Sequence, residues 1–426
     1  MRCTVFALLA FAVVPRAIAG NPPGPPAGEW VSPAYGYHLS ATASGYRVFD
    51  VLGDGCTRRA DDTPLFAVFK PTHDDGLHAY ATHEPYAYAF RRAPAPCRVI
   101  EGDDPALNMA AVKRFFRQHY AFDAERHIAP DAAAERSGDR LDEATLQAFL
   151  RQYRDAHVSF EGMLEGREVA LESDAGRMDE IAARVPAPFL RTYWSGHVAQ
   201  TVLGGKGRFF AHRRIQSGVL DGGIGYLALV SMGGFAEGED DDLAVLDSSL
   251  QAILADFRAA GVHGVIIDLS VNSGGYDHLA RRLASAFTTQ PTVLYRKSTR
   301  DAMDRSQALE TDTLPAPLPL PLAVLTSNLT ISAAEVATLS LRAIGAEHLG
   351  EPTRGALSDA LVKFLPNGDR ITLSNEVYLD SDGIAWEARG IEPRVTRPNL
   401  LTDDPLASHL ALVREAARLL ASNARM

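Results

Sequence analysis

The stretch PLAVLTSNLTISAAEV, residues 321–336, joins an apolar run to the opening of a helix, and it decides how the rest of the chain is interpreted. PLAVL predicts a buried strand, and SAAEV predicts the first turn of a helix. The loop between them consists mainly of hydroxyl and amide residues. Loops that follow the carboxyl end of a strand face the crevice of an open α/β sheet. We therefore place Ser332 at a helix start beside a predicted crevice.

Two roles fit Ser332. The first is a helix N-cap, because the S-x-x-E spacing to Glu335 is the signature of a capping box, and the pattern alone favours this role. The second is a nucleophile, which would need a general base and N–H donors for an oxyanion. A helix N-terminus supplies such donors, because its first N–H groups are free and point toward negative charge.

A second segment, IIDLSVNSGGYDHL at residues 266–279, ends another predicted buried strand with Asn272, Gly274 and Gly275. Paired glycines let the backbone turn tightly and leave its N–H groups uncovered. Such amides could form half of an oxyanion hole, although a simple strand-to-helix turn would explain the same residues.

The N-terminus predicts a secretory signal over residues 1–19, because a basic start is followed by a short apolar core and the small-residue site Ala17-Ile18-Ala19. We therefore expect an exported protein, either periplasmic or secreted. No later apolar run is long enough to span a membrane. The formal charge of −11 and the lack of a basic stretch argue against nucleic acid as a partner.

Cys56 and Cys97 remain after the signal is removed, in a chain sent to an oxidising compartment. We predict a disulfide between them, with two buried free thiols as the alternative. His73, His78 and His83 are spaced by five, so on a strand they would not share one face. We expect no metal site.

Composition and periodicity divide the chain into four parts beyond the signal. Aromatic and β-branched residues with regular turn signals predict a small β-rich module over 28–100. Helical spacing of apolar residues predicts a helical cap over 105–160. Alternating strands and helices, closed by a hairpin at Asn367-Gly368, predict an α/β core over 161–402. We expect a C-terminal helix over 403–426.

Four segments occur in an order that resembles the tail-specific (C-terminal processing) protease family, which also contains the tricorn core and the interphotoreceptor retinoid-binding proteins. They are IIDLSVNSGG, VLTSNLTISAAEV, LGEPTRGALSD and LPNGDRITLSNEVYLDSDGIAWEARGIEP. The resemblance implies a crotonase-like α/β fold and a serine peptidase with Ser332 as nucleophile. It also implies an oxyanion hole made by the N–H of Ala333 and by a glycine of the turn, Gly274 first and Gly275 as the alternative.

One position departs from the processing proteases, which carry a lysine base where this chain has Ala356. Arg354 cannot replace that base, because a guanidinium stays protonated. Lys363 alternates with apolar neighbours on a predicted strand, and we expect it to be a solvated surface charge. The chain therefore resembles the branch of the family that lacks the catalytic lysine.

The tricorn-like branch uses a histidine base, and YRDAHVSF resembles its histidine motif. This resemblance makes His157 the candidate base, since imidazole titrates near neutral pH. Asp155 and Ser159 are candidates for orienting its ring. Glu387 in AWEARGIEP matches the glutamate of the family and would position a water or a polar partner. A surface glutamate paired with Arg389 is the alternative for Glu387.

The sequence thus predicts an exported serine peptidase of the Ser-His-Glu type that acts on peptides or proteins and needs no cofactor. The alternative from another class is a non-catalytic module that binds a ligand or peptide on the same fold. The net acidic charge would favour basic or neutral peptides, but charge balance alone sets no specificity. The sequence does not predict an oligomeric state.

Overall fold

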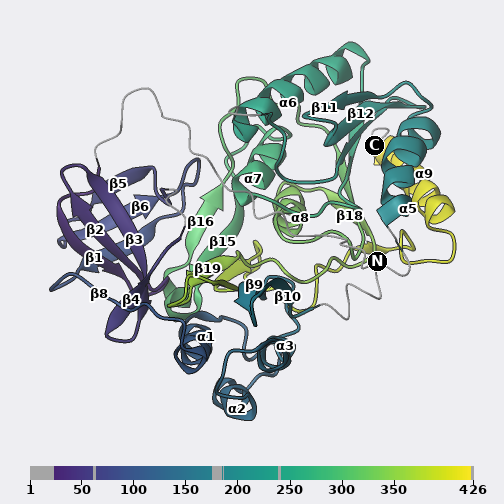
Figure 1. The fold of residues 1–426 in the computed structure, drawn as a ribbon. Coiled ribbons are helices and arrows are strands. Elements are labelled where there is room, and N and C mark those ends of the chain that lie inside the picture. The colour runs from purple at the N-terminus through teal and green to yellow at the C-terminus, as the bar shows by residue number, and fades with distance from the viewer. Residues whose placement is uncertain (1–23, 61–63, 175–184, 186, 238–240, 424–426) are drawn as a thin grey trace.

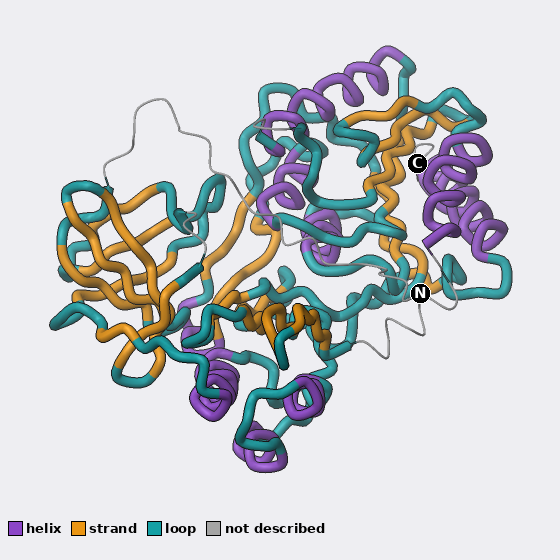
Figure 2. Tube along the Cα trace, in the orientation of Figure 1, coloured by secondary structure: helices purple, strands orange, loops and turns teal. Residues whose placement is uncertain are grey.

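The computed structural model describes residues 24–60, 64–174, 185, 187–237 and 241–423 as a mixed α/β fold built on several sheets (Figures 1 and 2). The predicted α/β class is confirmed in this general form. The predicted signal segment, residues 1–19, lies outside the described residues.

Residues 322–326 of the opening stretch form β17 in a seven-stranded sheet with the order β11-β12-β13-β14-β17-β18-β22. The strands from β13 to β22 are parallel, whereas β11 and β12 are antiparallel additions at one edge. Their bounds are β11 Arg208–Phe210, β12 Ile215–Leu220, β13 Ile224–Leu229, β14 Gly264–Asp268, β17 Leu322–Thr326, β18 Glu347–Gly350 and β22 Val395–Thr396.

Helices cover both faces of this sheet (Figure 1). On one face lie α6 (Asp242–Ala259), α7 (Asp277–Ser285) and α8 (Ala333–Ala343). On the other lie α5 (Ala187–Thr192), the π-helix η1 (Tyr193–Val202) and α9 (Pro405–Asn423). Helix α9 falls within the C-terminal segment for which a helix is expected.

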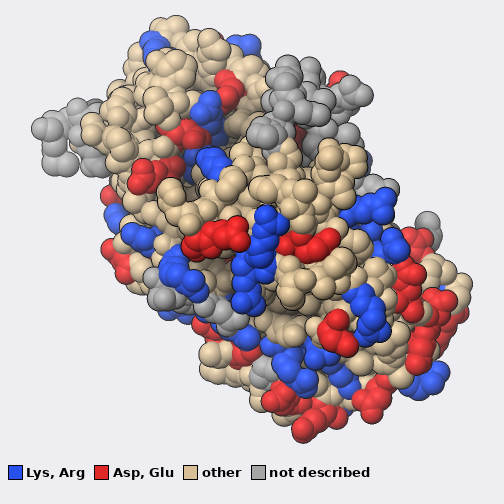
Figure 3. Space-filling model, turned by 90° about the vertical axis from the view of Figure 1, so that its left-hand side faces the viewer, with Lys and Arg blue, Asp and Glu red and all other residues tan. Residues whose placement is uncertain are grey.

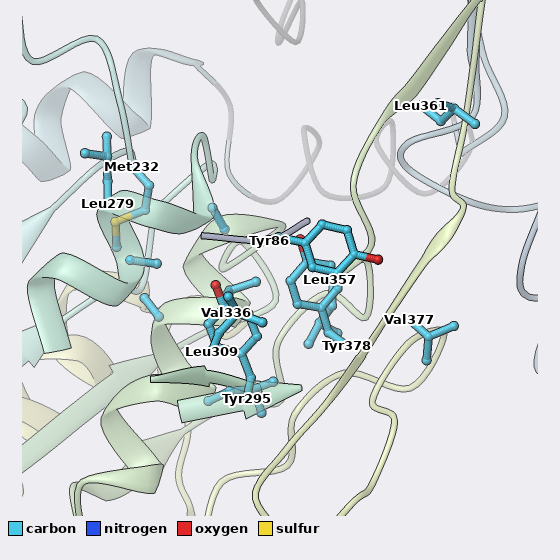
Figure 4. Packing of buried hydrophobic residues seen from close by; sticks show 14 of the residues in the cluster. Tyr86, Met232, Leu279, Tyr295, Leu309, Val336, Leu357, Leu361, Val377 and Tyr378 are labelled. Atoms are coloured by element: carbon cyan, nitrogen blue, oxygen red, sulfur yellow. The ribbon is translucent and has the colours of Figure 1, made fainter. Parts of the chain in front are cut away.

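Side chains of the central strands alternate between the two helical layers, because successive residues of a strand point to opposite faces. In β14, Val265 and Ile267 belong to the larger core cluster, and Ile266 belongs to the cluster packed against α9. Figure 4 shows part of the larger cluster, to which Leu279 of α7 and Val336 of α8 contribute. A continuous apolar strand such as β14 is therefore buried on both sides.

The N-terminal module is one eight-stranded sheet with the order β5-β6-β7-β1-β2-β3-β4-β8. A disulfide joins Cys56 in β4 to Cys97, which precedes β8. The strand bounds are β1 Gly28–Ser32, β2 Tyr37–Thr42, β3 Gly45–Leu52, β4 Gly55–Arg58, β5 Val68–Pro71, β6 Gly76–Tyr80, β7 Tyr88–Arg92 and β8 Arg98–Val99.

The expected cap contains α1 (Pro105–His119), α2 (Pro130–Arg136) and α3 (Glu143–Leu150). Helix α1 begins at a proline and is capped by Asp104, whose carboxylate accepts a hydrogen bond from the N–H of Ala106 at 3.0 Å. The predicted boundary between cap and core at residue 160 falls inside strand β9 (Ser159–Leu164).

Strand β9 belongs to a four-stranded sheet with the order β10-β9-β20-β19. This sheet contains the predicted hairpin, formed by β19 (Leu361–Phe364) and β20 (Arg370–Leu373), and β10 spans Arg167–Glu172. A three-stranded sheet with the order β16-β15-β21 completes the fold. The bounds are β15 Val293–Thr299, β16 Gln307–Glu310 and β21 Glu376–Leu379. The short helix η2 (Arg300–Arg305) follows β15.

The expectation that Lys363 is a solvated charge is wrong, because the N-terminal module packs over β19 and buries this side chain completely. Its ammonium donates to the carbonyls of Tyr35 and Gly36 at 2.6 and 3.0 Å and to the carboxylate of Asp50 at 2.9 Å. Burial lowers the pKa of Lys363 to about 8, and Asp50 opposes that shift. Lys363 therefore fastens the module to the sheet that carries β9.

The face of the molecule shown in Figure 3 carries basic and acidic side chains that are interspersed, without a large region of one sign. No described helix combines the length and the apolar character needed to cross a bilayer.

Candidate active site

Ser332 lies between the loop that follows β17 and the first turn of α8, where its backbone has φ 59° and ψ −128°. Residues other than glycine rarely adopt a positive φ, and such a conformation costs about 1–3 kcal/mol. The surrounding hydrogen bonds hold this conformation. The Ser332 Oγ lies 3.1 Å from Nε2 of His157, in hydrogen-bond distance.

Glu335, the fourth residue of the S-x-x-E motif, is fully buried. Its carboxylate accepts hydrogen bonds from the N–H of Ser332 at 3.1 Å, of Gly355 at 2.7 Å and of Ala356 at 2.9 Å, and from the hydroxyl of Thr353 at 2.6 Å. Burial raises the pKa of Glu335, whereas these donors favour its charged form. The carboxylate contact to Ser332 is the one that a capping box requires, and the other contacts tie the loop 353–356 to the start of α8.

His157 lies in the short connection between α3 and β9, and its side chain reaches the Ser332 hydroxyl from the cap side of the molecule. The ring is almost completely buried, and Nδ1 has no hydrogen-bond partner among the described residues. Burial lowers the pKa of His157, the Asp155 carboxylate opposes this shift, and the Arg126 guanidinium adds to it. The imidazole is therefore neutral at neutral pH, as a general base must be.

Neither residue expected to orient the His157 ring makes a hydrogen bond to it within the described structure. Asp155 accepts from the backbone N–H of His157 at 2.9 Å and from the hydroxyl of Tyr120 at 2.9 Å. Ser159 starts β9, where its backbone pairs with Glu172 and Thr372. Asp155 thus fixes the backbone of the turn and acts on the ring through its charge.

Glu387 does not contact Ser332 or His157 in the described hydrogen bonds, and it is not paired with Arg389, whose guanidinium donates to the carbonyl of Ala385. Its carboxylate accepts from Arg126 at 2.6 Å, from the N–H of Leu357 at 2.7 Å and from that of Ser358 at 3.1 Å. Burial raises the pKa of Glu387 to about 8, and the Arg126 guanidinium opposes the shift.

Arg126 is the residue that sequence reasoning missed. Its guanidinium lies 3.4 Å from the carboxylate of Asp155 and 2.6 Å from that of Glu387, and it donates to the carbonyl of Gly355 at 3.2 Å. It therefore connects the turn that carries His157 with the loop that Glu335 holds. Arg126 belongs to no motif, and a single arginine in a polar connection gives no signal of this role.

The turn after β14 lies directly beside Ser332. A Cβ on Gly274 would approach the Cβ of Ser332 to 2.6 Å and the N of Ala333 to 3.2 Å, so only glycine fits there. The N–H of Gly274 donates to the side-chain oxygen of Asn272 at 3.0 Å and is therefore occupied. The carbonyl of Gly274 and the N–H of Tyr276 both bond to Met232, so the N–H of Gly275 points away from Met232.

Within the part of the chain that the structure describes, the N–H groups of Gly275 and Ala333 donate to no acceptor. Ala333 is the first residue of α8, and the N–H of that position has no partner inside a helix. Two free N–H donors are what an oxyanion needs, and Gly275 follows directly on the glycine that packs against Ser332. Of the two glycines considered from the sequence, Gly275 has the free N–H.

The buried lysines are bound elsewhere. The carbonyl of Ala356 accepts from the N–H of Ser332 at 3.1 Å. Lys363 is held by the N-terminal module, and Lys297 lies 3.2 Å from Asp277 and 2.8 Å from Glu376. The base within reach of the Ser332 hydroxyl is thus an imidazole.

Residues 223–397 match the family model described as peptidase family S41. The match covers less than half of the chain, and it includes the turn at Gly275, Ser332 and Glu387 but not His157. It supports a peptidase. No curated protein matches the chain.

Two solved structures share the fold. The chain is similar to a candidate peptidase from Parabacteroides merdae, with a TM-score of 0.59 and 21 % identity over 75 % of this chain and 97 % of that one. It is also similar to a mutant of CPAF, with a TM-score of 0.53 and 12 % identity over 75 % of this chain and 98 % of that one. At these identities the likeness concerns the fold alone.

Proposed function

We propose that the chain is a serine peptidase in which Ser332 is the nucleophile and His157 is the general base. The observation that carries the proposal is the 3.1 Å distance between Ser332 Oγ and His157 Nε2, which joins residues 175 positions apart in the sequence. A nucleophile and a base within hydrogen-bond reach are the first geometric requirement for acyl transfer. The match to a peptidase family supplies the substrate class.

In the proposed reaction, Ser332 Oγ attacks the carbonyl carbon of a peptide bond while His157 Nε2 takes the hydroxyl proton. The N–H groups of Ala333 and Gly275 stabilise the oxyanion of the tetrahedral intermediate. His157 then returns the proton to the leaving amine, and an ester between Ser332 and the acyl group remains. Water attacks this ester with His157 again as base, which releases the carboxylic acid and restores the hydroxyl.

The buried charges around the pair have positioning roles in this proposal. Glu335 holds the backbone of Ser332 and of the loop 353–356, so the hydroxyl is directed at the base. Arg126 and Glu387 hold the other side of the same loop. Preorganisation of this kind lowers the reorganisation needed in the transition state.

We also propose that the protein is exported to the periplasm or secreted. The predicted signal over residues 1–19 and the disulfide between Cys56 and Cys97 support this location, because disulfides persist in oxidising compartments.

The test is covalent labelling of the purified chain with a fluorophosphonate, together with hydrolysis of a quenched-fluorescence peptide library. We expect the wild type to label and to cleave, the Ser332→Ala variant not to label, and both Ser332→Ala and His157→Gln to cleave at least about a thousandfold more slowly. Ser44→Ala, at an exposed position in the N-terminal module, is the matched control and should behave as the wild type. A folded wild type that neither labels nor cleaves would instead indicate a binding module, and labelling that persists in Ser332→Ala would reject the assigned nucleophile.

A further inference from the structure

A hollow of about 470 Å³ opens on the cap side of the molecule, between the segment after α1 and the segment after α3. Four arginines line it together with His127 and Gln152, and none of the described lining residues is acidic. The arginines are Arg126, Arg136, Arg151 and Arg154. We refer to this site as the basic hollow. Four guanidinium groups around one hollow are notable in a chain with a formal charge of −11.

Three of the four arginines have no carboxylate partner among the described residues. Arg136 donates to the neutral amide oxygen of Gln152 at 2.9 Å, and the side chains of Arg151 and Arg154 make no hydrogen bond or ion pair there. Arg126 is the exception, because it forms ion pairs with the carboxylates of Asp155 and Glu387, which compensate its charge. The basic hollow thus gathers positive charge that the protein itself does not neutralise, and such a concave site attracts anions.

The basic hollow adjoins the proposed active site. Arg126 donates to the carbonyl of Arg154 at 2.5 Å and to the carbonyl of Gly355 at 3.2 Å. Gly355 precedes Ala356, whose carbonyl bonds to the N–H of Ser332 at 3.1 Å, and Arg154 lies three residues before His157. Two hydrogen bonds and the peptide link between Gly355 and Ala356 thus connect Arg126 of the basic hollow to the backbone of Ser332.

We propose that the basic hollow is a subsite for acidic side chains of the peptide substrate. The inference rests on the proposed function, because it assigns a preference to the same site. Arginine suits this role, since its planar fork can donate two parallel hydrogen bonds to one carboxylate. The guanidinium groups of Arg136, Arg151 and Arg154 belong to exposed residues, so a side chain of a passing peptide can enter from solvent. Local charge therefore predicts the opposite preference from the net charge of the chain.

Binding can be measured without catalysis by titrating the Ser332→Ala protein calorimetrically with a hexaglutamate peptide and with a hexaglutamine peptide. We expect the glutamate peptide to bind at least about tenfold more tightly, and this difference to shrink at high salt. The double variant Arg151→Gln/Arg154→Gln should lose most of it. Arg47→Gln/Arg91→Gln, which removes the same charge from exposed arginines of the N-terminal module, should not.

Equal affinity for both peptides, or equal losses in both double variants, would overturn the subsite. Binding of inorganic pyrophosphate but not of the glutamate peptide would overturn it as well, because it would indicate a site for small anions. In the active protein we expect Arg151→Gln/Arg154→Gln to raise KM for glutamate-containing peptides about tenfold with kcat and fluorophosphonate labelling unchanged. Labelling separates the two proposals, since a wild type that labels but shows no preference for glutamate peptides rejects only the subsite.

Discussion

The two halves of the proposed active site are built differently. The Ser332 half is held through backbone groups. Three backbone N–H groups donate hydrogen bonds to the buried carboxylate of Glu335, which fixes both the turn that carries Ser332 and the loop 353–356. The His157 half consists of side chains, in which Arg126 joins Asp155 to Glu387. The imidazole ring itself is held by packing and by its contact with Ser332, since Nδ1 has no partner among the described residues.

This difference shows how the site divides two demands. The oxyanion donors must be fixed in advance, because their stabilising effect depends on their not having to reorganise. The base must keep a neutral ring in the right place, and burial next to both a carboxylate and a guanidinium allows its pKa to be adjusted from either side. In the proposed mechanism, the backbone half therefore sets the geometry of the site and the side-chain half sets the protonation of the base.

The strongest test of the comparison is whether the two halves act as one unit. We expect Ser332→Ala and His157→Gln each to lower kcat/KM by about a thousandfold or more, and the double variant to lose no more than either single one. Steady-state hydrolysis of a quenched peptide by all three proteins measures this. Independent, multiplicative losses would mean that the two residues do not share a step.

Glu335→Gln should have the next largest effect. In this variant an amide NH2 replaces one carboxylate oxygen, and it would face backbone N–H groups that now donate to the carboxylate. We expect kcat to fall about a hundredfold, and the free energy of unfolding to fall by about 1–3 kcal/mol. Urea denaturation and kinetics measure the two effects. Glu168→Gln, an exposed position on β10, is the control and should change neither. If both Glu335→Gln and its control behave as the wild type, the backbone half is not held by this carboxylate.

Removing the charge of Asp155 and removing that of Arg126 should shift the pH dependence of kcat/KM in opposite directions. Activity needs neutral His157, so it falls as pH drops through the pKa of this residue, which burial places below 6.5. Asp155 raises that pKa and Arg126 lowers it. Asp155→Asn should therefore move the acidic limb to lower pH, and Arg126→Gln should move it to higher pH.

We expect each of these two variants to reduce activity at neutral pH by about tenfold. pH profiles measured on protein shown to be folded by circular dichroism check the direction of each shift. Shifts in the same direction, or no shift in either variant, would contradict the assignment of charge control to this half.

The smallest effect on catalysis is expected from the disulfide, which lies in the N-terminal module and touches neither half. Replacing Cys56 and Cys97 by alanine should lower the free energy of unfolding by about 4 kcal/mol, as expected for a cross-link between residues 41 positions apart. For the folded protein, kcat/KM should change by less than about twofold. Thermal and urea unfolding, with reduced wild type for comparison, measure the loss. A collapse of kcat in the folded double variant would show that the module takes part in the site.

Ser332 and the glycine turn were visible in the sequence because they follow directly on buried strands, whereas His157 follows helix α3 and was found through the family resemblance. The apolar runs before Ser332 and before Asn272 predict buried strands, and the loop that carries Ser332 was expected to face a crevice. The structure brings Ser332, the glycine turn and His157 together. Which glycine keeps a free N–H depends on the side chain of Asn272, and no spacing rule predicts where that amide bonds.

The sequence by itself determined the local features: strands read from apolar runs, helices read from 3.6-residue spacing, the hairpin at Asn367-Gly368 and a hydroxyl at a helix start. These depend on neighbours in the chain, so pattern and propensity are sufficient to predict them. Tertiary structure alone decided that Lys363 is buried under the N-terminal module, that Arg126 bridges Asp155 and Glu387, and that four arginines meet in one hollow. Charged side chains of this kind carry no periodic signal, and their environment is set by residues far away in the sequence that fold against them.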